Sequence, residues 1–244
     1  MEKTRPRRLL EAENRLAYLF LSKGAVSFDG SENDERSMSS NVPFSLNFGK
    51  IINEIGDVAD AYANYVADVM IKGRREDMPL THVHGPAYSG ISLAVLIVTK
   101  LKEMRRIWGI RRSYGLKGGG VYGKIEPGAK VLLVDDFIIS GRTVRKNYQA
   151  VRDAQPAAEV VGCLASLDVR SIDDKGRYVI DGLEEDLGIE IHTVLPFSNM
   201  VWEYHGMKTG NDGKVYVDDR AFEDFNDYLR GQRAKVTRTS GTHT

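Results

Sequence analysis

The feature that most constrains the fold is an alternation of mainly apolar segments with segments of helical periodicity. Residues 130–135 (KVLLVD) and 159–168 (EVVGCLASLD) are almost continuous apolar runs, and the helical pattern of residues 143–154 separates them. Strands that are apolar on both faces occur in parallel sheets that helices cover on each side. We therefore predict an α/β protein with a mainly parallel central sheet flanked by helices.

The same alternation continues over most of the chain. Residues 42–49 predict a short strand or an extended turn. Additional strands are expected at residues 80–84 and 189–196, and helices at residues 8–22, 50–72, 91–104 and 218–230. These elements group into an N-terminal helical hood segment (1–78), a core (79–198), a closing segment (199–230) and a tail (231–244) whose polar composition predicts disorder.

Charge and hydropathy narrow the class of protein. The 244 residues carry 34 basic and 34 acidic side chains, whereas a protein that neutralises nucleic-acid phosphates usually has a basic face. We therefore expect no nucleic-acid partner. The first residues contain no long apolar run, so they match neither a signal peptide nor a membrane span. A cytoplasmic protein without a membrane partner is expected.

Three side chains that often carry chemistry have ordinary interpretations in this sequence. Cys163 is the single cysteine and lies in an apolar run, so we expect a buried structural thiol. His82 and His84 alternate along a predicted strand, a spacing that suits a metal, but no third ligand is evident. We expect both histidines to be polar residues near a strand end.

Two adjacent acids stand at the end of a predicted strand in residues 131–143 (VLLVDDFIISGRT). Ligands of open parallel sheets bind beyond the carboxyl ends of the strands, and Asp135 and Asp136 suit hydroxyl donors such as those of a sugar. The next loop enters a helix N-terminus, whose unpaired N–H groups favour a phosphate. A strand whose terminal acids only cap the next helix would give a similar pattern.

Four stretches together resemble one enzyme family. Residues 131–143 resemble the 5-phosphoribosyl-1-diphosphate (PRPP) signature of type I phosphoribosyltransferases. Residues 85–94 (GPAYSGISLA) resemble the pyrophosphate loop of orotate phosphoribosyltransferases, and residues 42–49 (VPFSLNFG) resemble their base-site stretch. Residues 118–123 (GGGVYG) and 165–171 (ASLDVRS) resemble the end of their mobile loop and their SLDRQE segment. The chain is identified by this resemblance as a type I phosphoribosyltransferase, most like the orotate enzymes.

The resemblance implies the fold, the reaction and the partners. It implies the type I phosphoribosyltransferase fold and transfer of the 5-phosphoribosyl group from PRPP to orotate, giving orotidine 5'-monophosphate and pyrophosphate. Mg²⁺ would be held mainly through substrate and water, without a dedicated set of protein ligands. Residues 114–123 would form a glycine-rich lid that excludes water, shared between the subunits of a homodimer.

The resemblance also assigns roles to single residues. Asp135 and Asp136 would hold the ribose hydroxyls. The 5-phosphate would lie against Phe137, Ile138, Ile139, Ser140, Gly141, Arg142 and Thr143. The pyrophosphate would lie against Ala87, Tyr88, Ser89, Gly90, Arg111 and Arg112. The base would lie near Phe44, Ser45 and Arg170. Lys117, the only lysine of the lid, is assigned to the leaving pyrophosphate.

The chain departs from the family pattern at several of these positions. Ser89 stands where the family has a lysine, and the lid contains no histidine. The family's base-contacting arginine aligns with Val169, which leaves Arg170 one place along. Two alternatives therefore remain open: a phosphoribosyltransferase for another base, and a PRPP-binding regulator without catalysis.

Overall fold

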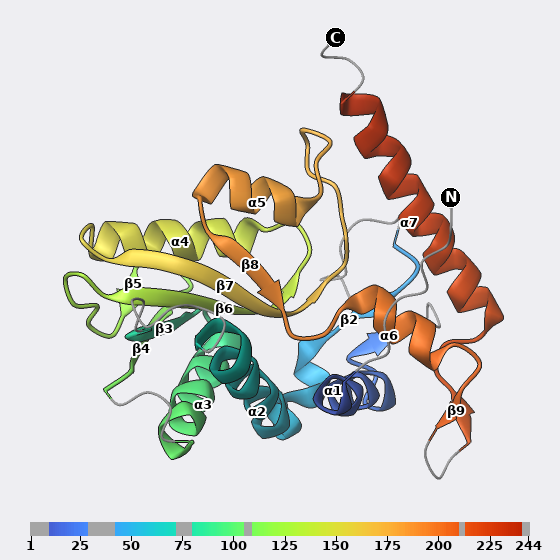
Figure 1. The fold of residues 1–244 in the computed structure, drawn as a ribbon, viewed down its shortest axis with the longest axis horizontal. Coiled ribbons are helices and arrows are strands. Elements are labelled where there is room, and N and C mark those ends of the chain that lie inside the picture. The colour runs from blue at the N-terminus through green and yellow to red at the C-terminus, as the bar shows by residue number, and fades with distance from the viewer. Residues whose placement is uncertain (1–9, 29–41, 72–79, 105–108, 210–212, 241–244) are drawn as a thin grey trace. The chain divides into compact units, whose positions relative to one another are not determined.

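The computed structural model describes residues 10–28, 42–71, 80–104, 109–209 and 213–240 (Figure 1). The chain divides into two compact units. Unit 1 comprises residues 1–52, 174–177 and 195–244, and unit 2 comprises residues 53–173 and 178–194.

Unit 2 contains a six-stranded sheet. Its strands are β3 (His82–Gly85), β4 (Arg111–Gly115), β5 (Val121–Tyr122), β6 (Lys130–Ile138), β7 (Glu159–Asp168) and β8 (Glu190–Thr193). They lie in the order β5-β4-β3-β6-β7-β8, and all neighbours are parallel except β4 and β5. The predicted α/β fold with a mainly parallel sheet is therefore confirmed.

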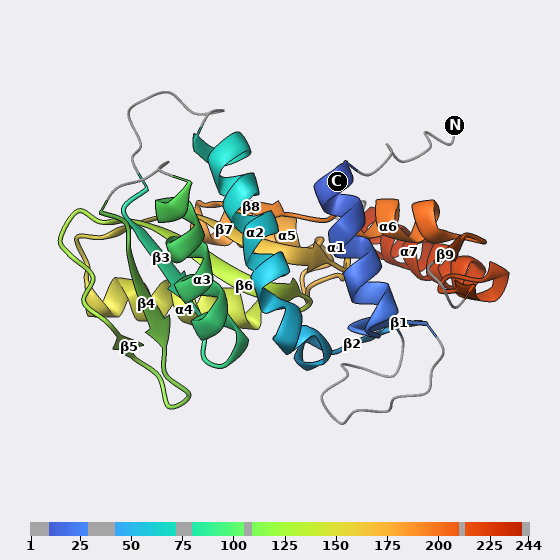
Figure 2. The ribbon, with the colours of Figure 1, turned by 90° about the horizontal axis from the view of Figure 1, so that it is seen from below.

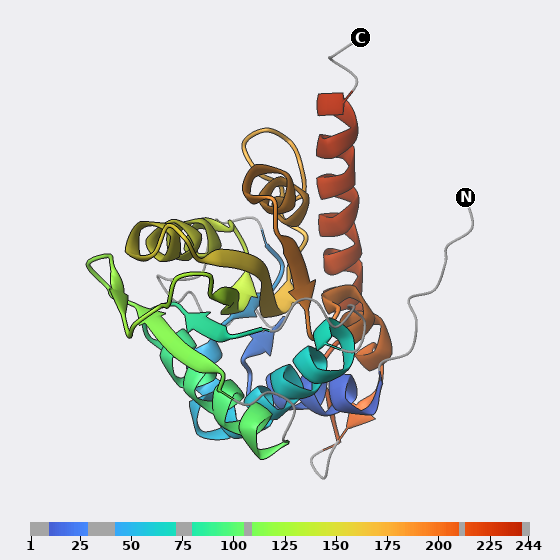
Figure 3. The same ribbon diagram turned by 60° about the vertical axis from the view of Figure 1, so that its left-hand side comes forward.

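Helices cover both faces of this sheet, because its central strands are apolar on both sides. Residues 131–134 of β6 are each 2% exposed or less. One face carries α2 (Ile55–Tyr65), its π-helical extension (Val66–Ile71) and α3 (Ser89–Glu103), as Figure 2 shows. The other face carries α4 (Arg142–Ala154) and α5 (Val179–Leu187), which lie opposite α3 in Figure 3. Cys163 of β7 is fully buried, as expected.

Unit 1 combines helices with two short strand pairs. Its elements are α1 (Glu11–Ser22), β1 (Val26–Ser27), β2 (Ser45–Leu46), α6 (Phe197–Tyr204), β9 (Lys208–Thr209), β10 (Lys214–Val215) and α7 (Asp219–Ser240). A 3-10 helix (Phe48–Glu54) begins in unit 1 and ends in unit 2. Aromatic rings form the core of unit 1: Phe44 lies 4.9 Å from Phe197 and 5.6 Å from Tyr228 between ring centroids. Among the described residues, no helix combines the length and apolarity that a bilayer span requires.

Several predicted boundaries were wrong. The hood segment was predicted to reach residue 78, but α2 packs on α3 and belongs to unit 2. The tail was predicted to be disordered from residue 231, yet α7 continues to Ser240, because extending an existing helix is less costly than starting one. Residues 241–244 lie outside the described part. Helices α5 and α6 were not predicted.

Candidate functional site at the carboxyl edge of the sheet

Strand β6 continues through the acidic pair, three residues beyond its predicted end. Asp135 is 5% exposed, while Asp136, which points to the other face of the pleat, is partly exposed. Burial, reinforced by the neighbouring Asp136, raises the pKa of Asp135 well above its usual value. The Tyr62 hydroxyl donates to the backbone carbonyl of Asp135 at 2.5 Å. The backbone at the buried acid is therefore fixed by Tyr62, and Asp136 is the more accessible of the two acids.

Asp136 connects the acidic pair to the start of α3. Its Oδ2 accepts a hydrogen bond from the Ser89 hydroxyl at 2.9 Å, and its Oδ1 accepts from the Phe137 N–H at 2.8 Å. Strands β3 and β6 are parallel neighbours, so the loop after β3 and the acids of β6 share one edge of the sheet. Among the described residues, no basic side chain forms an ion pair with either acid. Both predicted halves of a sugar-diphosphate site therefore meet here.

The loop between β6 and α4 leaves the helix N-terminus open to a ligand. Gly141 has left-handed backbone angles (φ 68°, ψ 2°), and no side chain caps the first turn of α4. A Cβ on Gly141 would lie 2.9 Å from Leu183 Cδ1, so both conformation and space require glycine. Ser140, Arg142 and Thr143 are exposed. Exposed hydroxyls, an arginine and the N–H groups of a helix N-terminus are donors of the kind that suit an anion.

One predicted phosphate-loop residue has a packing role. Ile138 is 1% exposed, so its side chain belongs to the core and only its backbone remains for a ligand. The loop is held by the end of β7: the Ser171 hydroxyl donates to the Ile139 carbonyl, and the Val169 N–H donates to the Ile138 carbonyl at 3.3 Å.

Backbone strain marks the same edge of the sheet, a signal that the sequence did not reveal. Among the described residues, Tyr88 (φ 69°) and Arg170 (φ 57°) are the non-glycine residues with positive φ. They follow β3 and β7, the two neighbours of β6. Strained conformations of this kind concentrate at functional sites.

These elements match a known family over most of the chain. The model of the phosphoribosyl transferase domain matches residues 50–195. The chain belongs to the type I phosphoribosyltransferase family. It is 28% identical over 200 residues to the orotate phosphoribosyltransferase of Clostridium acetobutylicum, covering 77% of this chain and 84% of that protein.

Solved phosphoribosyltransferases share the fold. The crystal structure of the Francisella tularensis orotate phosphoribosyltransferase has a TM-score of 0.67 at 20% identity, covering 89% of this chain and 98% of that one. The Mycobacterium tuberculosis orotate phosphoribosyltransferase in complex with PRPP has a TM-score of 0.51 at 16% identity, covering 78% and 98%.

In this phosphoribosyltransferase the predicted lid is a paired β-hairpin rather than an open loop. Tyr114 and Tyr122 pair across β4 and β5, and their rings stack at 5.0 Å with planes 14° apart. Only residues 116–120 form the turn. Lys117 is exposed there, with its Nζ 5.9 Å from the ring centroid of Tyr88, next to Ser89 of the predicted pyrophosphate loop.

The two predicted arginines of this hairpin differ. Arg111 forms an ion pair with Glu126, which also pairs with Lys124 at 3.0 Å, so the predicted contact of Arg111 with pyrophosphate competes with this pair. Arg112 is exposed and points to the opposite face of the strand. Of the predicted pyrophosphate residues on the loop after β3, Ala87 and Ser89 are partly exposed, Tyr88 is exposed and Gly90 is buried.

Asp168 and Arg170 end β7. Asp168 is 7% exposed, and burial raises its pKa to about 6, although the Arg170 N–H (2.9 Å) and the charge of Arg170 oppose the rise. The Arg170 guanidinium lies 4.2 Å from the ring centroid of Tyr178 and 3.8 Å from the Asp168 carboxylate. Arg170 is exposed but already stacked, so a base would have to share it with Tyr178.

The other predicted base residues lie in unit 1. Phe44 is 7% exposed and surrounded by aromatic rings, so its predicted place beside the base does not fit its position: it is a core residue. The Ser45 hydroxyl is bonded to that of Ser27 at 2.6 Å and is partly exposed. A role for Ser45 stays a prediction.

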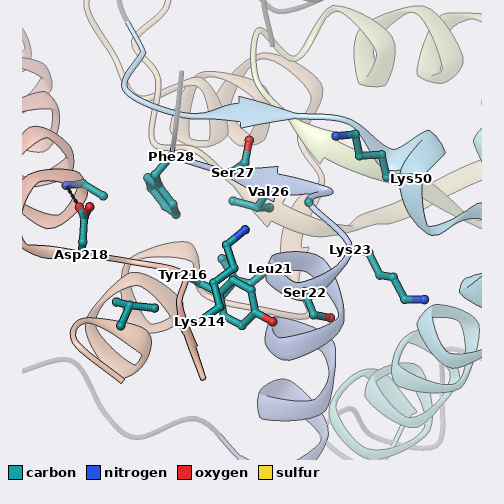
Figure 4. A pocket seen from close by; sticks show the side chains of 13 residues that line it. Leu21, Ser22, Lys23, Val26, Ser27, Phe28, Lys50, Lys214, Tyr216 and Asp218 are labelled. Atoms are coloured by element: carbon teal, nitrogen blue, oxygen red, sulfur yellow. Dashed lines mark hydrogen bonds between the residues drawn. The ribbon is translucent and has the colours of Figure 1, made fainter. Parts of the chain in front are cut away.

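Unit 1 also contains a cavity of about 410 Å³ (Figure 4). Lys23, Lys50 and Lys214 line it, and the Lys214 Nζ lies 5.6 Å from the ring centroid of Tyr216. Among the described lining residues the one carboxylate is Asp218, which accepts a hydrogen bond from the Ala221 N–H and caps α7. This cavity therefore differs in chemistry from the acidic edge of the sheet.

Among the described residues, no group of three or more His, Cys, Asp or Glu side chains could enclose a metal ion. The partly exposed carboxylate of Asp136 is a hard oxygen donor of the kind that Mg²⁺ prefers, and Mg²⁺ commonly retains several waters and binds substrate phosphates. The donor set at the sheet edge thus fits an ion carried largely by the substrate.

Proposed function

We propose that this protein transfers the 5-phosphoribosyl group of PRPP to orotate, giving orotidine 5'-monophosphate and pyrophosphate. The observation that carries the proposal is the Ser89–Asp136 hydrogen bond, which joins the predicted pyrophosphate loop to the predicted ribose-binding acids beside an uncapped helix N-terminus. In the reaction the bond from ribose C1 to pyrophosphate oxygen breaks, and its electron pair leaves with pyrophosphate. A ring N–H nitrogen of the base forms the new bond to C1 and loses its proton to pyrophosphate or water.

The residues of the sheet edge would act by position and charge. The backbone N–H groups at the start of α4, with Ser140 and Thr143, would anchor the 5-phosphate and so place C1. Asp136 would accept hydrogen bonds from the ribose hydroxyls, with the buried Asp135 as the less accessible second acceptor, and the charge of Asp136 would favour the cationic ring of the transition state. Lys117 would meet the leaving pyrophosphate. Mg²⁺, held by substrate oxygens and by Asp136 through water, would neutralise the pyrophosphate charge.

Orotate is favoured by the names of the relatives, and one observation favours another base. Phe44 is packed in the core of unit 1, and Arg170 is stacked on Tyr178, so two predicted base contacts have other partners. A phosphoribosyltransferase for another base is therefore the second candidate. A PRPP-binding regulator is the third, because the hairpin lacks the family's histidine. For the enzyme we also propose a cytoplasmic homodimer that shares the hairpin between subunits.

One assay separates these candidates. The protein is incubated with PRPP and Mg²⁺ and offered orotate, uracil, adenine or hypoxanthine separately, while pyrophosphate release is followed. We expect release with orotate alone. Release with another base alone would replace orotate in the proposal. No release with any base, together with measurable PRPP binding, would contradict enzymatic transfer and favour the regulator.

A further inference from the structure

Four buried polar side chains form a continuous chain of hydrogen bonds on the face of the sheet that α4 covers. They are His82 and His84 of β3, Ser113 of β4 and Asn147 of α4, and each is 7% exposed or less. Alternation along β3 points both histidines to the same face. The parallel register sets His84 beside Ser113. The sequence predicted polar residues near a strand end, and the structure places these histidines in the core.

The direction of each hydrogen bond follows from Asn147, where the hydrogen-bond chain ends. The Asn147 amide donates to the Thr143 carbonyl at 2.8 Å, so its Oδ1 accepts from His84 Nε2–H at 3.1 Å. A neutral His84 then accepts at Nδ1, where the Ser113 hydroxyl donates at 2.8 Å. Ser113 Oγ in turn accepts from His82 Nε2–H at 2.9 Å. Burial lowers the pKa of both histidines to about 4, which keeps them neutral at pH 7.

Gly115 allows the hydrogen-bond chain to contact the base of the β4–β5 hairpin. A Cβ on Gly115 would lie 2.7 Å from the Asn147 Oδ1, so the end of β4 approaches α4 closely only without a side chain. The turn that carries Lys117 begins at the next residue. The same Asn147 side chain donates to the carbonyl of Thr143, in the first turn of α4. Asn147 thus meets both the base of the hairpin, at Gly115, and the first turn of α4, which follows the predicted phosphate loop.

We propose that the chain His82–Ser113–His84–Asn147 is a positioning device that sets the place of the β4–β5 hairpin, and so of Lys117, relative to the phosphate loop. A shift of β4 against α4 would leave a buried donor or acceptor unpaired, which disfavours other placements of the hairpin. The catalytic consequence of this placement rests on the proposed function, whereas the placement itself does not.

The first test measures the placement without turnover. Spin labels are attached to Leu116→Cys in the hairpin turn and Gln149→Cys on α4, both exposed positions, while the native Cys163 is fully buried. We expect a narrow distance distribution that broadens or shifts in Gly115→Ala. Gly56→Ala is the matched control, because its Cβ would meet nothing within 4 Å. If Gly115→Ala gives the same label-distance distribution as Gly56→Ala, the proposal is overturned.

A second pair of variants covers the case in which Gly115→Ala does not fold. His82→Gln retains an N–H that can donate to Ser113, whereas His82→Leu retains none. The leucine variant should alter the label distance and the glutamine variant should restore it. Equal distributions in the two variants would contradict the positioning role.

The third measurement separates positioning from general stability. In Gly115→Ala we expect kcat to fall by about tenfold to a hundredfold, while the Kd for PRPP with Mg²⁺ changes by less than about threefold. Gly56→Ala should change neither. An unchanged kcat in folded Gly115→Ala would overturn the catalytic consequence. If the wild-type protein transfers no base, the proposed function fails, and the label distances alone decide the placement.

Discussion

The β6–α4 segment and the β4–β5 hairpin both contribute to the candidate site, but they obtain their structure differently. In the first, strand, acids, glycine turn and helix are contiguous, so the ligand-facing groups follow from local conformation. In the second, a glycine-rich stretch becomes a paired hairpin whose base contacts a buried chain from β3 and α4. A contiguous motif can thus present groups that suit an anion through local conformation alone, whereas the place of a cation beside it depends on packing between distant segments.

The largest effect should come from Asp136→Asn in the contiguous segment. Asparagine can still accept from Ser89 or Phe137, so the fold should persist, but the negative charge beside the ribose is lost. We expect kcat to fall on the order of a hundredfold to a thousandfold. Pyrophosphate release and a thermal melt measure this together. Near-normal turnover would show that the accessible acid does not serve the ribose.

Gly141→Ala should disrupt the turn of the same segment. The positive φ costs about 1–2 kcal/mol with a Cβ present, and the overlap with Leu183 adds about 1–3 kcal/mol. PRPP affinity should fall with the stability. Gly128→Ala is the control, since its φ is 73° but its Cβ would meet open space. If both variants lose equal stability and keep PRPP affinity, the turn is not specific to the phosphate.

The pH dependence of stability tests the raised pKa of Asp168, at the carboxyl edge of the sheet. Its carboxyl has a pKa of about 6 in the folded protein, against a usual value of 3.8, with Arg170 and Asp181 as the charges facing it. The folded state therefore binds more protons than the unfolded chain between about pH 4 and pH 6. The free energy of unfolding should fall as pH rises through this window, by up to about 3 kcal/mol.

Asp168→Asn should remove this dependence. Urea unfolding at a series of pH values would show the difference between the wild type and the variant, declining from pH 4 to pH 6 and level on either side. Parallel stability profiles for the two proteins would contradict a raised pKa.

The smallest effect should come from Lys117→Ala in the hairpin. Because Lys117 is exposed, water screens its charge, and we expect kcat to fall by about tenfold with little change in PRPP affinity. Lys124→Ala, in the segment that follows the hairpin, is the matched control. Equal losses of kcat in the two lysine variants would contradict a specific role for Lys117, and Arg112 would then be the candidate for the contact with pyrophosphate.

Prediction from sequence succeeded where neighbours along the chain set the conformation. The apolar runs of β6 and β7 and the glycine at position 141 were sufficient to predict the parallel sheet and a turn into the start of α4. It failed where distant segments decide. Phe44 belongs to an aromatic core with rings from α6 and α7, and the polar end of α7 stays helical because a helix precedes it.

By itself, the sequence determined the strand, the two acids and the glycine turn, because backbone conformation and strand polarity depend on adjacent residues. Only the tertiary structure decided that Asp135 is buried while Asp136 meets Ser89, and that two histidines join the hairpin to α4. These contacts link residues from 29 to 63 positions apart, so they exist only once the sheet has brought its strands together.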